Sequence, residues 1–364
     1  MTERIVSSFK IEGEFISSRS YGGGHINGTE LVRTRAGDSE RLYVLQRINK
    51  NVFKRPDLLM ENYVSVTEFI REKIVREGGD PEREAVSIIR ANDGKSYHID
   101  EAGDYWRMLT YIPDSISYDK TERPEQFYES AVTFGNFQYM LRDYPADTLH
   151  ETIPNFHNTP ERYRQLIEAA EADACGRYEK VKADVDFARA RVDFTEIFER
   201  AREEGRLPIR VTHNDTKLNN VLFDKKTGRA LCVVDLDTIM PGYAINDFGD
   251  SIRFGATTAA EDESDLSKVN FDIELFEMYL RGFIEGAKGG LTDAEIDLLP
   301  ESAIMMTLEC GMRFLADYLA GDTYFKISRE GQNLDRARNQ FKLVQDMEAR
   351  LEDMHKLVEK YAGK

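Results

Sequence analysis

Hydrophobic and polar residues alternate along residues 13–49, in short runs separated by turns that contain glycine or aspartate. Such alternation is typical of antiparallel β-strands. Across 57–77 the apolar residues instead recur at helical spacing and predict one long helix, carried by Leu59, Tyr63, Val66, Phe69, Ile70 and Ile74. Further strands are expected at 85–90, 97–100 and 105–112. The first part of the chain therefore predicts a sheet accompanied by one long helix.

Helical periodicity dominates the rest of the chain. Helices are predicted at 124–144, 160–182 and 192–205. Residues 207–242 have the pattern of strands and turns, and the chain from 271 onward is nearly all helical, ending in one amphipathic helix over 334–361. This order predicts an α+β fold with a β-rich N-terminal lobe, a hinge and a mainly helical C-terminal lobe, at 1–108, 109–113 and 114–364.

The composition excludes several classes of partner. The chain has 364 residues, 41% apolar and 32% charged, which suits a globular protein of two domains or lobes. Its formal net charge of −17 disfavours nucleic acid and anionic membranes, because both require a basic face. There is no apolar run of about 18 residues and no signal-peptide core at the N-terminus. Three scattered cysteines fit a reducing compartment, so a cytoplasmic protein is expected, of open oligomeric state.

One segment carries a pattern of reactive side chains. His213, Asp215 and Asn220 match the pattern H-x-D-x-x-x-x-N. Phosphoryl transfer depends mainly on positioning and charge neutralisation. Asp215 can orient or accept the proton of an attacking hydroxyl, and Asn220 can offer a neutral oxygen to Mg²⁺. His213 is predicted to support the loop by hydrogen bonds, and Lys217 lies where a cation could approach the γ-phosphate of ATP.

A β-hairpin that ends in an acidic residue is predicted directly after this loop. A short strand at 222–224, a turn at 225–228 and an apolar strand at 230–234 lead to Asp235. An acidic residue at this place is a natural second ligand for Mg²⁺. The loop alone could be an ordinary polar turn, but its combination with the hairpin and a β-rich first lobe favours a kinase that uses ATP and Mg²⁺.

The tripeptide Asp247-Phe248-Gly249 spells the metal-binding motif of protein kinases. However, no apolar strand precedes it. We therefore assign the metal to Asp235 and expect Asp247 to brace the catalytic loop through hydrogen bonds.

Nucleotide contacts are expected from the first lobe. The glycine-rich segment 22–28 joins two predicted strands and does not match G-x-G-x-x-G, which disfavours a Rossmann site. Backbone N–H groups of Gly23 and Gly24 could cover phosphates, and a plain glycine turn is the alternative.

The third predicted strand lacks the lysine with which protein kinases hold the α- and β-phosphates. Gln46 stands at the expected position and Arg47 follows it. Alternation along a strand allows only one of the two to face the nucleotide. Adenine is expected against the backbone of the connector, at Met108, Thr110 and Ile112.

Four stretches closely resemble the bacterial N-acetylhexosamine 1-kinases of the aminoglycoside phosphotransferase and choline kinase-like superfamily: 212–220, 235–242, 247–255 and 309–319. The resemblance implies a protein-kinase-like bilobal fold and phosphorylation of the anomeric hydroxyl of N-acetylglucosamine or N-acetylgalactosamine to the α-1-phosphate. It implies that Asp215 is the base and that Asn220 and Asp235 hold Mg²⁺. The implied sugar contacts are His25, Asp215, Asp235, Thr238, Phe254, Arg313 and Tyr324.

Each sugar contact also has a plainer explanation. His25 could be only a turn residue, Phe254 a core residue, and Tyr324 a packing residue. Arg313 could instead pair with Glu309 or Asp317 on the same helix face.

Two other functions stay open as well. One is a kinase of the same fold for another alcohol, such as homoserine, an amino alcohol or an aminoglycoside. The other is a non-catalytic nucleotide or sugar sensor, which the missing strand lysine favours and the intact Asp215, Asn220 and Asp235 oppose.

Overall fold

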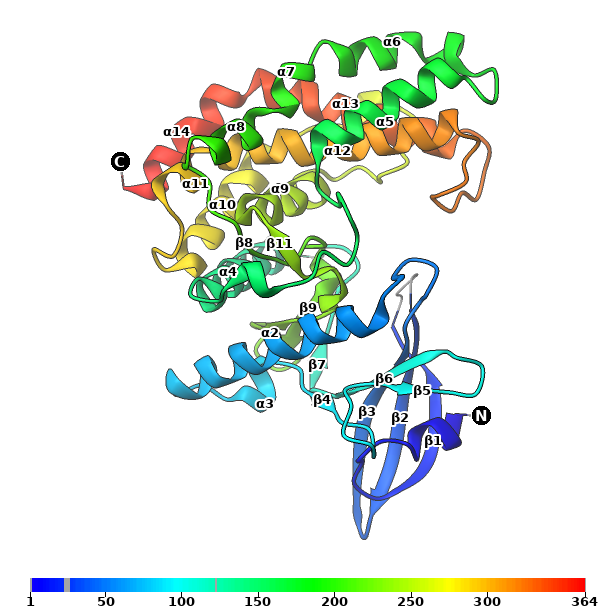
Figure 1. Ribbon diagram of the computed structural model, residues 1–364. Coiled ribbons are helices and arrows are strands. Elements are labelled where there is room, and N and C mark those ends of the chain that lie inside the picture. Colours follow the sequence, from blue (N-terminus) through cyan, green and yellow to red (C-terminus); the bar gives the residue numbers. More distant parts are fainter. Residues whose placement is uncertain (1, 23–26, 122, 364) are drawn as a thin grey trace. The chain divides into compact units, whose positions relative to one another are not determined.

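A computed structural model describes residues 2–22, 27–121 and 123–363. The chain falls into two compact units, whose elements are labelled in Figure 1. Unit 1 contains Met1–Ile116, Asp143–Pro154 and Leu222–Pro241, and unit 2 contains Ser117–Arg142, Asn155–Val221 and Gly242–Lys364. Each unit is described by itself.

The large sheet of unit 1 is antiparallel throughout, in the order β1-β2-β3-β6-β4 with β5 against β6. Its strands are β1 (Glu14–Ser20), β2 (Gly28–Ala36), β3 (Ser39–Arg47), β4 (Ile88–Ile89), β5 (His98–Ile99) and β6 (Tyr105–Thr110). Val32, Leu45 and Met108 point into a core that the short helix α1 (Thr2–Val6) closes with Ile5 and Val6. The predicted strands across 13–49 and 105–112 are confirmed.

The long helix of unit 1 is α2 (Pro56–Arg76), followed by the single turn α3 (Pro81–Glu84). Its buried face carries Leu59, Tyr63, Val66 and Ile74, so the predicted periodicity is confirmed. Asn62 lies on the same face, and its amide nitrogen donates to the carbonyl oxygens of His150 (2.8 Å) and Ile239 (3.0 Å). The helix therefore fixes two distant loops of its own unit.

A smaller sheet of unit 1 has the order β10-β9-β7. It contains β7 (Ser115–Ile116), β9 (Val221–Asp224) and β10 (Ala230–Val233). The β9–β10 hairpin is the one predicted after the catalytic loop. The other short elements of this part of the chain are η1 (Ala146–Thr148), η3 (Leu236–Thr238) and β11 (Met240–Gly242).

Unit 2 is mainly helical. Its longer helices are α4 (Pro124–Leu141), α5 (Thr159–Ala172), α6 (Tyr178–Arg189), α9 (Ala244–Gly255), α10 (Ile273–Ala287), α12 (Leu299–Leu319), α13 (Gln332–Ala349) and α14 (Leu351–Ala362). The shorter elements are α7 (Val192–Thr195), α8 (Ile197–Glu203), β8 (Arg210–Thr212), η2 (Leu218–Asn220), η4 (Leu266–Lys268) and α11 (Asp293–Asp297).

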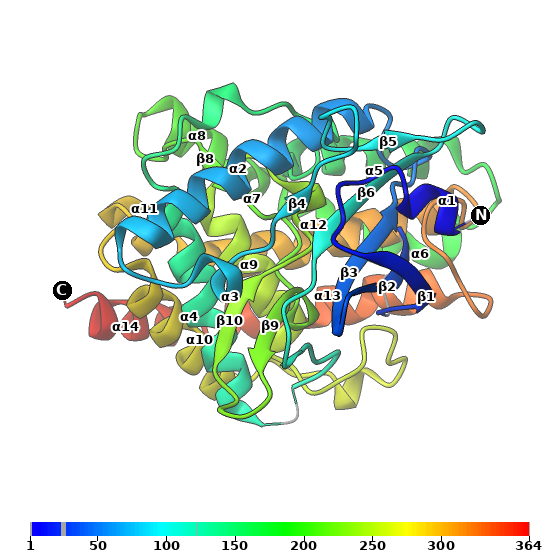
Figure 2. The same ribbon diagram turned by 90° about the horizontal axis from the view of Figure 1, so that it is seen from below.

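Glycines let two helix pairs of unit 2 approach closely. Helices α4 and α10 lie side by side in Figure 2. A Cβ atom at Gly135 would lie 2.2 Å from the carbonyl oxygen of Phe283, and one at Gly249 would lie 2.2 Å from that of Ser302. Both distances are too short for a side chain. Gly249, the last residue of the tripeptide that resembles a kinase motif, thus serves the contact between α9 and α12.

Two long predicted helices are each divided in the structure. The helix expected over 160–182 is α5 and α6, because the chain turns at Asp173, whose φ of 38° is left-handed. The helix expected over 334–361 is α13 and α14, separated at Arg350. In both cases the apolar periodicity continues across the break, so periodicity alone did not reveal it.

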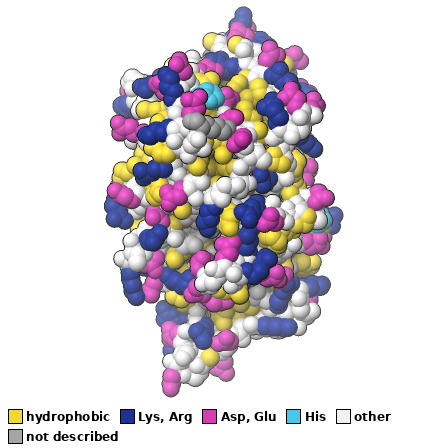
Figure 3. All heavy atoms as spheres, turned by 90° about the vertical axis from the view of Figure 1, so that its left-hand side faces the viewer, with side chains coloured by type: hydrophobic (Ala, Val, Ile, Leu, Met, Phe, Trp, Pro, Cys, Tyr) yellow, Lys and Arg dark blue, Asp and Glu magenta, His cyan; other side chains and the backbone are white. Residues whose placement is uncertain are grey.

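Acidic and basic side chains are interspersed on the face drawn in Figure 3. Among the described residues, no helix is both long enough and apolar enough to cross a membrane.

Candidate active site

The catalytic loop of unit 2 runs from β8 to η2. His213 is completely buried, and the rings of Phe134 and Phe137 lie edge-on to its imidazole, with centroids 5.5 and 5.9 Å away. Its Nδ1 accepts the backbone N–H of Asp215 at 3.3 Å. These contacts agree with the supporting role predicted for His213.

Asp247 braces the start of the loop. Its carboxylate accepts the backbone N–H groups of His213 (2.9 Å) and Asn214 (2.8 Å) and the side-chain amide of Gln138 (2.7 Å). Burial raises the pKa of Asp247 above its ordinary value, although these donors favour the charged form. The residue lies in the first turn of α9, and the predicted bracing role is confirmed.

Asp250, one helical turn further along α9, holds the middle of the loop. It accepts the backbone N–H of Thr216 at 3.0 Å and pairs with Arg253 at 3.0 Å. Burial acts to raise the pKa of Asp250, but Arg253 and Lys217 outweigh burial and lower it. One helix therefore fixes two successive parts of the loop.

The loop brings three of the predicted reactive side chains together. Lys217 Nζ lies 2.6 Å from Asp215 Oδ1, and Asn220 Nδ2 donates to Asp215 Oδ2 at 3.1 Å. Burial acts to lower the pKa of Lys217, but Asp215 raises it above its ordinary value, so the ammonium stays charged. Because the amide nitrogen of Asn220 faces Asp215, the amide oxygen is the atom that could ligate a cation.

His157 supports the loop from the segment before α5. Its Nδ1 lies 2.8 Å from Glu309 Oε1 and its Nε2 lies 3.3 Å from the carbonyl oxygen of Asn214. Thr159 donates to the other oxygen of Glu309 at 2.8 Å. Burial acts to lower the pKa of His157, but Glu309 raises it overall. The sequence had not indicated His157, because a single histidine in a polar turn carries no pattern.

In unit 1, Asp235 follows β10 as predicted and is solvent-exposed. Its φ of 61° places it in the left-handed region, which aspartate tolerates better than most residues. Thr238, another implied sugar contact, is buried in η3 of the same unit. Asp237, two residues after Asp235, is also buried.

Gln46 and Arg107 lie directly opposite each other on β3 and β6. Arg107 is completely buried, donates to Gln46 Oε1 from Nε at 2.9 Å, and forms an ion pair with Asp237. Its guanidinium lies 4.6 Å from the ring centroid of Tyr63, and its Nη2 is buried without a partner among the described residues. Arg107 was missed in the sequence, although a charged residue inside an apolar strand is a signal of a buried ion pair.

The other predicted nucleotide contacts are distributed differently. Arg47 faces away from Gln46 and lies 3.6 Å from Asp104, as alternation requires. The N–H of Thr110 donates to the carbonyl oxygen of Ser87 at 2.9 Å. The side chains of Met108 and Ile112 are buried. Gly23, Gly24 and His25 lie outside the described residues.

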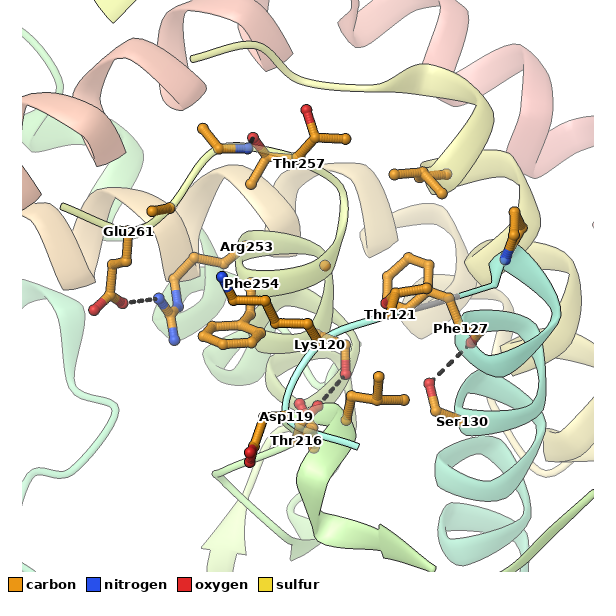
Figure 4. A pocket seen from close by; sticks show the side chains of 18 of the residues that line it. Asp119, Lys120, Thr121, Phe127, Ser130, Thr216, Arg253, Phe254, Thr257 and Glu261 are labelled. Carbon is orange, nitrogen blue, oxygen red and sulfur yellow. Dashed lines mark hydrogen bonds and ion pairs between the residues drawn. The ribbon is translucent and has the colours of Figure 1, made fainter. Parts of the chain in front are cut away.

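Phe254 lies at the end of α9 and lines a pocket of about 430 Å³ in unit 2. Figure 4 shows its ring beside the guanidinium of Arg253, which is bound to Glu261 at 3.0 Å. Thr216 of the catalytic loop lines the same pocket. Phe254 is partly exposed, so it is not simply a core residue.

Arg313 does not pair with either acid on its helix in the described part of the chain, so that alternative is wrong. Glu309 is held by His157 and Thr159. Asp317 accepts the backbone N–H groups of the loop after α12, including that of Tyr324 at 2.8 Å. The Tyr324 side chain is 68% exposed and therefore available to a ligand.

The model of the phosphotransferase enzyme family matches residues 38–285. The chain is similar to an aminoglycoside phosphotransferase from Alicyclobacillus acidocaldarius (12% identity, 99% of this chain, 97% of that chain, TM-score 0.65). It is also similar to a choline kinase from Cryptosporidium parvum (15% identity, 94% of this chain, 92% of that chain, TM-score 0.56). A third similar structure is a spectinomycin phosphotransferase solved with ADP and spectinomycin (11% identity, 92% of this chain, 94% of that chain, TM-score 0.55).

At these identities the solved structures establish the fold. The predicted kinase-like fold, with an antiparallel sheet in the N-lobe and a helical C-lobe, is confirmed. The family match covers more than half of the chain and includes the catalytic loop, the β9–β10 hairpin and Asp247. The chain belongs to the phosphotransferase enzyme family.

Proposed function

We propose that this chain is a cytoplasmic kinase that uses Mg²⁺-ATP to phosphorylate the anomeric hydroxyl of N-acetylglucosamine or N-acetylgalactosamine, giving the α-1-phosphate. The observation that carries the phosphoryl-transfer part is the trio of Asp215, Lys217 and Asn220. A carboxylate, a cation and an amide oxygen on one braced loop are the groups that this chemistry requires. The spectinomycin phosphotransferase structure contains ADP, which supports ATP as the donor.

Asp215 has the role of the base. It takes the proton of the attacking hydroxyl, and Lys217 supplies positive charge beside it. Asp247 and Asp250 keep the loop in place, and so they act through Asp215 without touching the reactants.

Asn220 and Asp235 have the role of ligands to Mg²⁺, which neutralises charge on the phosphates when it is bound. One amide oxygen and one exposed carboxylate suit a hard cation that takes its other ligands from phosphate and water. In the described part of the chain, no group of three or more His, Cys, Asp or Glu side chains could hold a metal ion.

The sugar part rests on the resemblance and on the surroundings of Arg313. Guanidinium groups can donate to sugar hydroxyls or to an N-acetyl carbonyl, and aromatic rings can cover the apolar face of a sugar. Arg313, Phe254 and Tyr324 are of these types, and all three are partly or largely exposed. Amino alcohols and aminoglycosides are cationic and would require an acidic pocket, so the positive charge of Arg313 disfavours them.

Incubation with Mg²⁺-ATP and either N-acetylhexosamine should release ADP and yield a sugar 1-phosphate. Asp215→Asn should lower kcat by about 10²–10⁴-fold, because the base is lost. The matched control Asp38→Asn, on the exposed β2–β3 turn, should turn over like the parent protein. A parent protein that shows no turnover on either sugar would contradict the proposal, and a panel with homoserine, choline and kanamycin would identify another acceptor. Sugar binding without any turnover would favour a sensor.

A further inference from the structure

Two arginines and three aromatic residues gather on one surface of unit 2. This arginine–aromatic cluster consists of Phe156, Arg162, Arg313, Tyr324 and Phe325. It combines the turn before α5, the first part of α5, the middle of α12 and the loop after α12. All five side chains are at least partly exposed, so a ligand can reach the cluster.

Arg313 contacts rings where a carboxylate would be expected. Its guanidinium carbon lies 5.6 Å from the ring centroids of both Phe156 and Phe325. The two acids on the same face of its helix are occupied: His157 and Thr159 bind both oxygens of Glu309, and backbone N–H groups bind Asp317. No carboxylate lies within ion-pair distance of Arg313 among the described residues.

Arg162 is also surrounded by neutral partners. It donates to the carbonyl oxygen of Phe156 and to Gln165 Oε1, each at 3.0 Å. Its Nε is buried and has no partner in the described ranges. Both arginines contact the same residue, because Arg162 binds the carbonyl oxygen of Phe156 and Arg313 lies over its ring. Burial and then the charge of Arg313 lower the pKa of Arg162.

The neighbouring Arg164 provides a contrast on the same helix. It lies between Glu161 and Glu168 and pairs with both. The cluster has less compensation, because the carboxylate near both of its arginines is that of Glu309, whose two oxygens are already held by His157 and Thr159. Two like charges remain together, and a bound anion would stabilise them through charge-assisted hydrogen bonds.

We propose that Arg162 and Arg313 bind an acidic substituent of the acceptor, so that the preferred substrate is an amino sugar that carries a carboxylate or a phosphate. This inference rests on the proposed sugar kinase function and narrows its substrate class. Arg162 and Arg313 supply planar donors for the anion, and Phe156, Tyr324 and Phe325 supply apolar faces for the sugar ring.

Calorimetric titration of the full chain without ATP tests the inference directly. The probes are N-acetylglucosamine, N-acetylmuramic acid and N-acetylglucosamine 6-phosphate. At least one acidic sugar should bind about 10- to 100-fold more tightly than the neutral one. The preference should weaken between about 50 and 500 mM NaCl. The acidic sugar that binds more tightly identifies the substituent as carboxylate or phosphate.

Arg162→Met and Arg313→Met should each remove most of this preference and raise KM for the acidic sugar more than they lower kcat. Arg162→Lys should restore part of the preference, since it keeps the charge without the planar fork. Arg164→Met should preserve the preference. Equal affinity of the parent protein for neutral and acidic sugars would overturn the inference. It would also be overturned if Arg162→Met lowered the affinity for the neutral sugar and for the acidic sugar by the same factor. Because the affinities are measured without ATP, the outcomes for affinity do not depend on whether any sugar is phosphorylated, whereas KM and kcat are compared only where turnover is observed.

Discussion

Each unit buries an aspartate next to a segment with a predicted catalytic role, but the two charges are stabilised differently. Asp237 of unit 1 faces the guanidinium of Arg107. Asp247 of unit 2 is surrounded by N–H dipoles of His213, Asn214 and Gln138. A buried ion pair is vulnerable to the loss of either member, whereas a carboxylate held by backbone amides depends on the geometry of the loop. Substitutions can separate the two cases.

Arg107→Met is expected to have the largest effect on stability. It leaves Asp237 buried without its cation and should lower the free energy of unfolding by about 3–5 kcal/mol. Denaturation in guanidinium chloride measures the loss. The double variant Arg107→Met/Asp237→Leu should recover part of it, because an apolar pair replaces the ionic one. Arg47→Met, on the outer side of β3, is the control. If the single and double variants lose the same stability, the ion pair is not the cause.

Asp247→Asn should lower the free energy of unfolding by less than Arg107→Met does, but it should have the larger effect on catalytic activity. One amide nitrogen would replace an oxygen that accepts hydrogen bonds from N–H groups. This loss should lower the free energy of unfolding by about 2–3 kcal/mol. The displaced loop should lower kcat by about 10²-fold, measured by ADP release. An unchanged kcat would show that Asp247 does not position the loop.

Gly249→Ala tests the helix contact behind the same loop. Its Cβ would lie 2.2 Å from the Ser302 carbonyl oxygen, and the required shift between α9 and α12 should cost about 1–3 kcal/mol. Gly28→Ala is a suitable control, because the nearest atom to its Cβ would be 3.9 Å away. Similar thermal stability of the two variants would contradict the close approach.

The His157–Glu309 pair should contribute about 1.5 kcal/mol to the free energy of unfolding, and this contribution should depend on pH. Since the pKa of folded His157 is raised, its contribution is complete below the unfolded value near pH 6.5 and is lost as the pH rises through the folded value. Glu309 has a lowered pKa, so its contribution is lost on acidification. The stability difference between the parent protein and His157→Gln should shrink as the pH rises from 6 through the raised pKa of folded His157. A difference independent of pH would exclude the charged pair.

The sequence predicted those features that depend on neighbouring residues. Alternation located β1, β2 and β3, helical spacing located α2, and the motif with its hairpin located Asp215, Asn220 and Asp235. The sequence also predicted that Asp247 braces the catalytic loop, and its hydrogen bonds to the loop backbone confirm this role.

Features that depend on distant residues were missed. Arg107 and Asp237 are 130 residues apart, and His157 and Glu309 are 152 apart. Only the fold brings such partners together. The same limit explains why the predicted ion pair of Arg313 is wrong. Glu309 and Asp317 stand at helical spacing from Arg313, but contacts from α5 and from the loop after α12 occupy them.

The left-handed backbone at Asp235 restricts what evolution can place there. Few side chains adopt a φ of 61° without strain, and aspartate, asparagine and glycine are the least penalised. Glutamate carries the same charge but fits this conformation poorly. In the proposed role of a Mg²⁺ ligand, aspartate combines this backbone conformation with a negative charge, whereas asparagine keeps the conformation and loses the charge. A single-nucleotide change between their codons would alter the charge of the site while preserving its shape, which makes this position a ready route from an active enzyme to a folded, inactive relative.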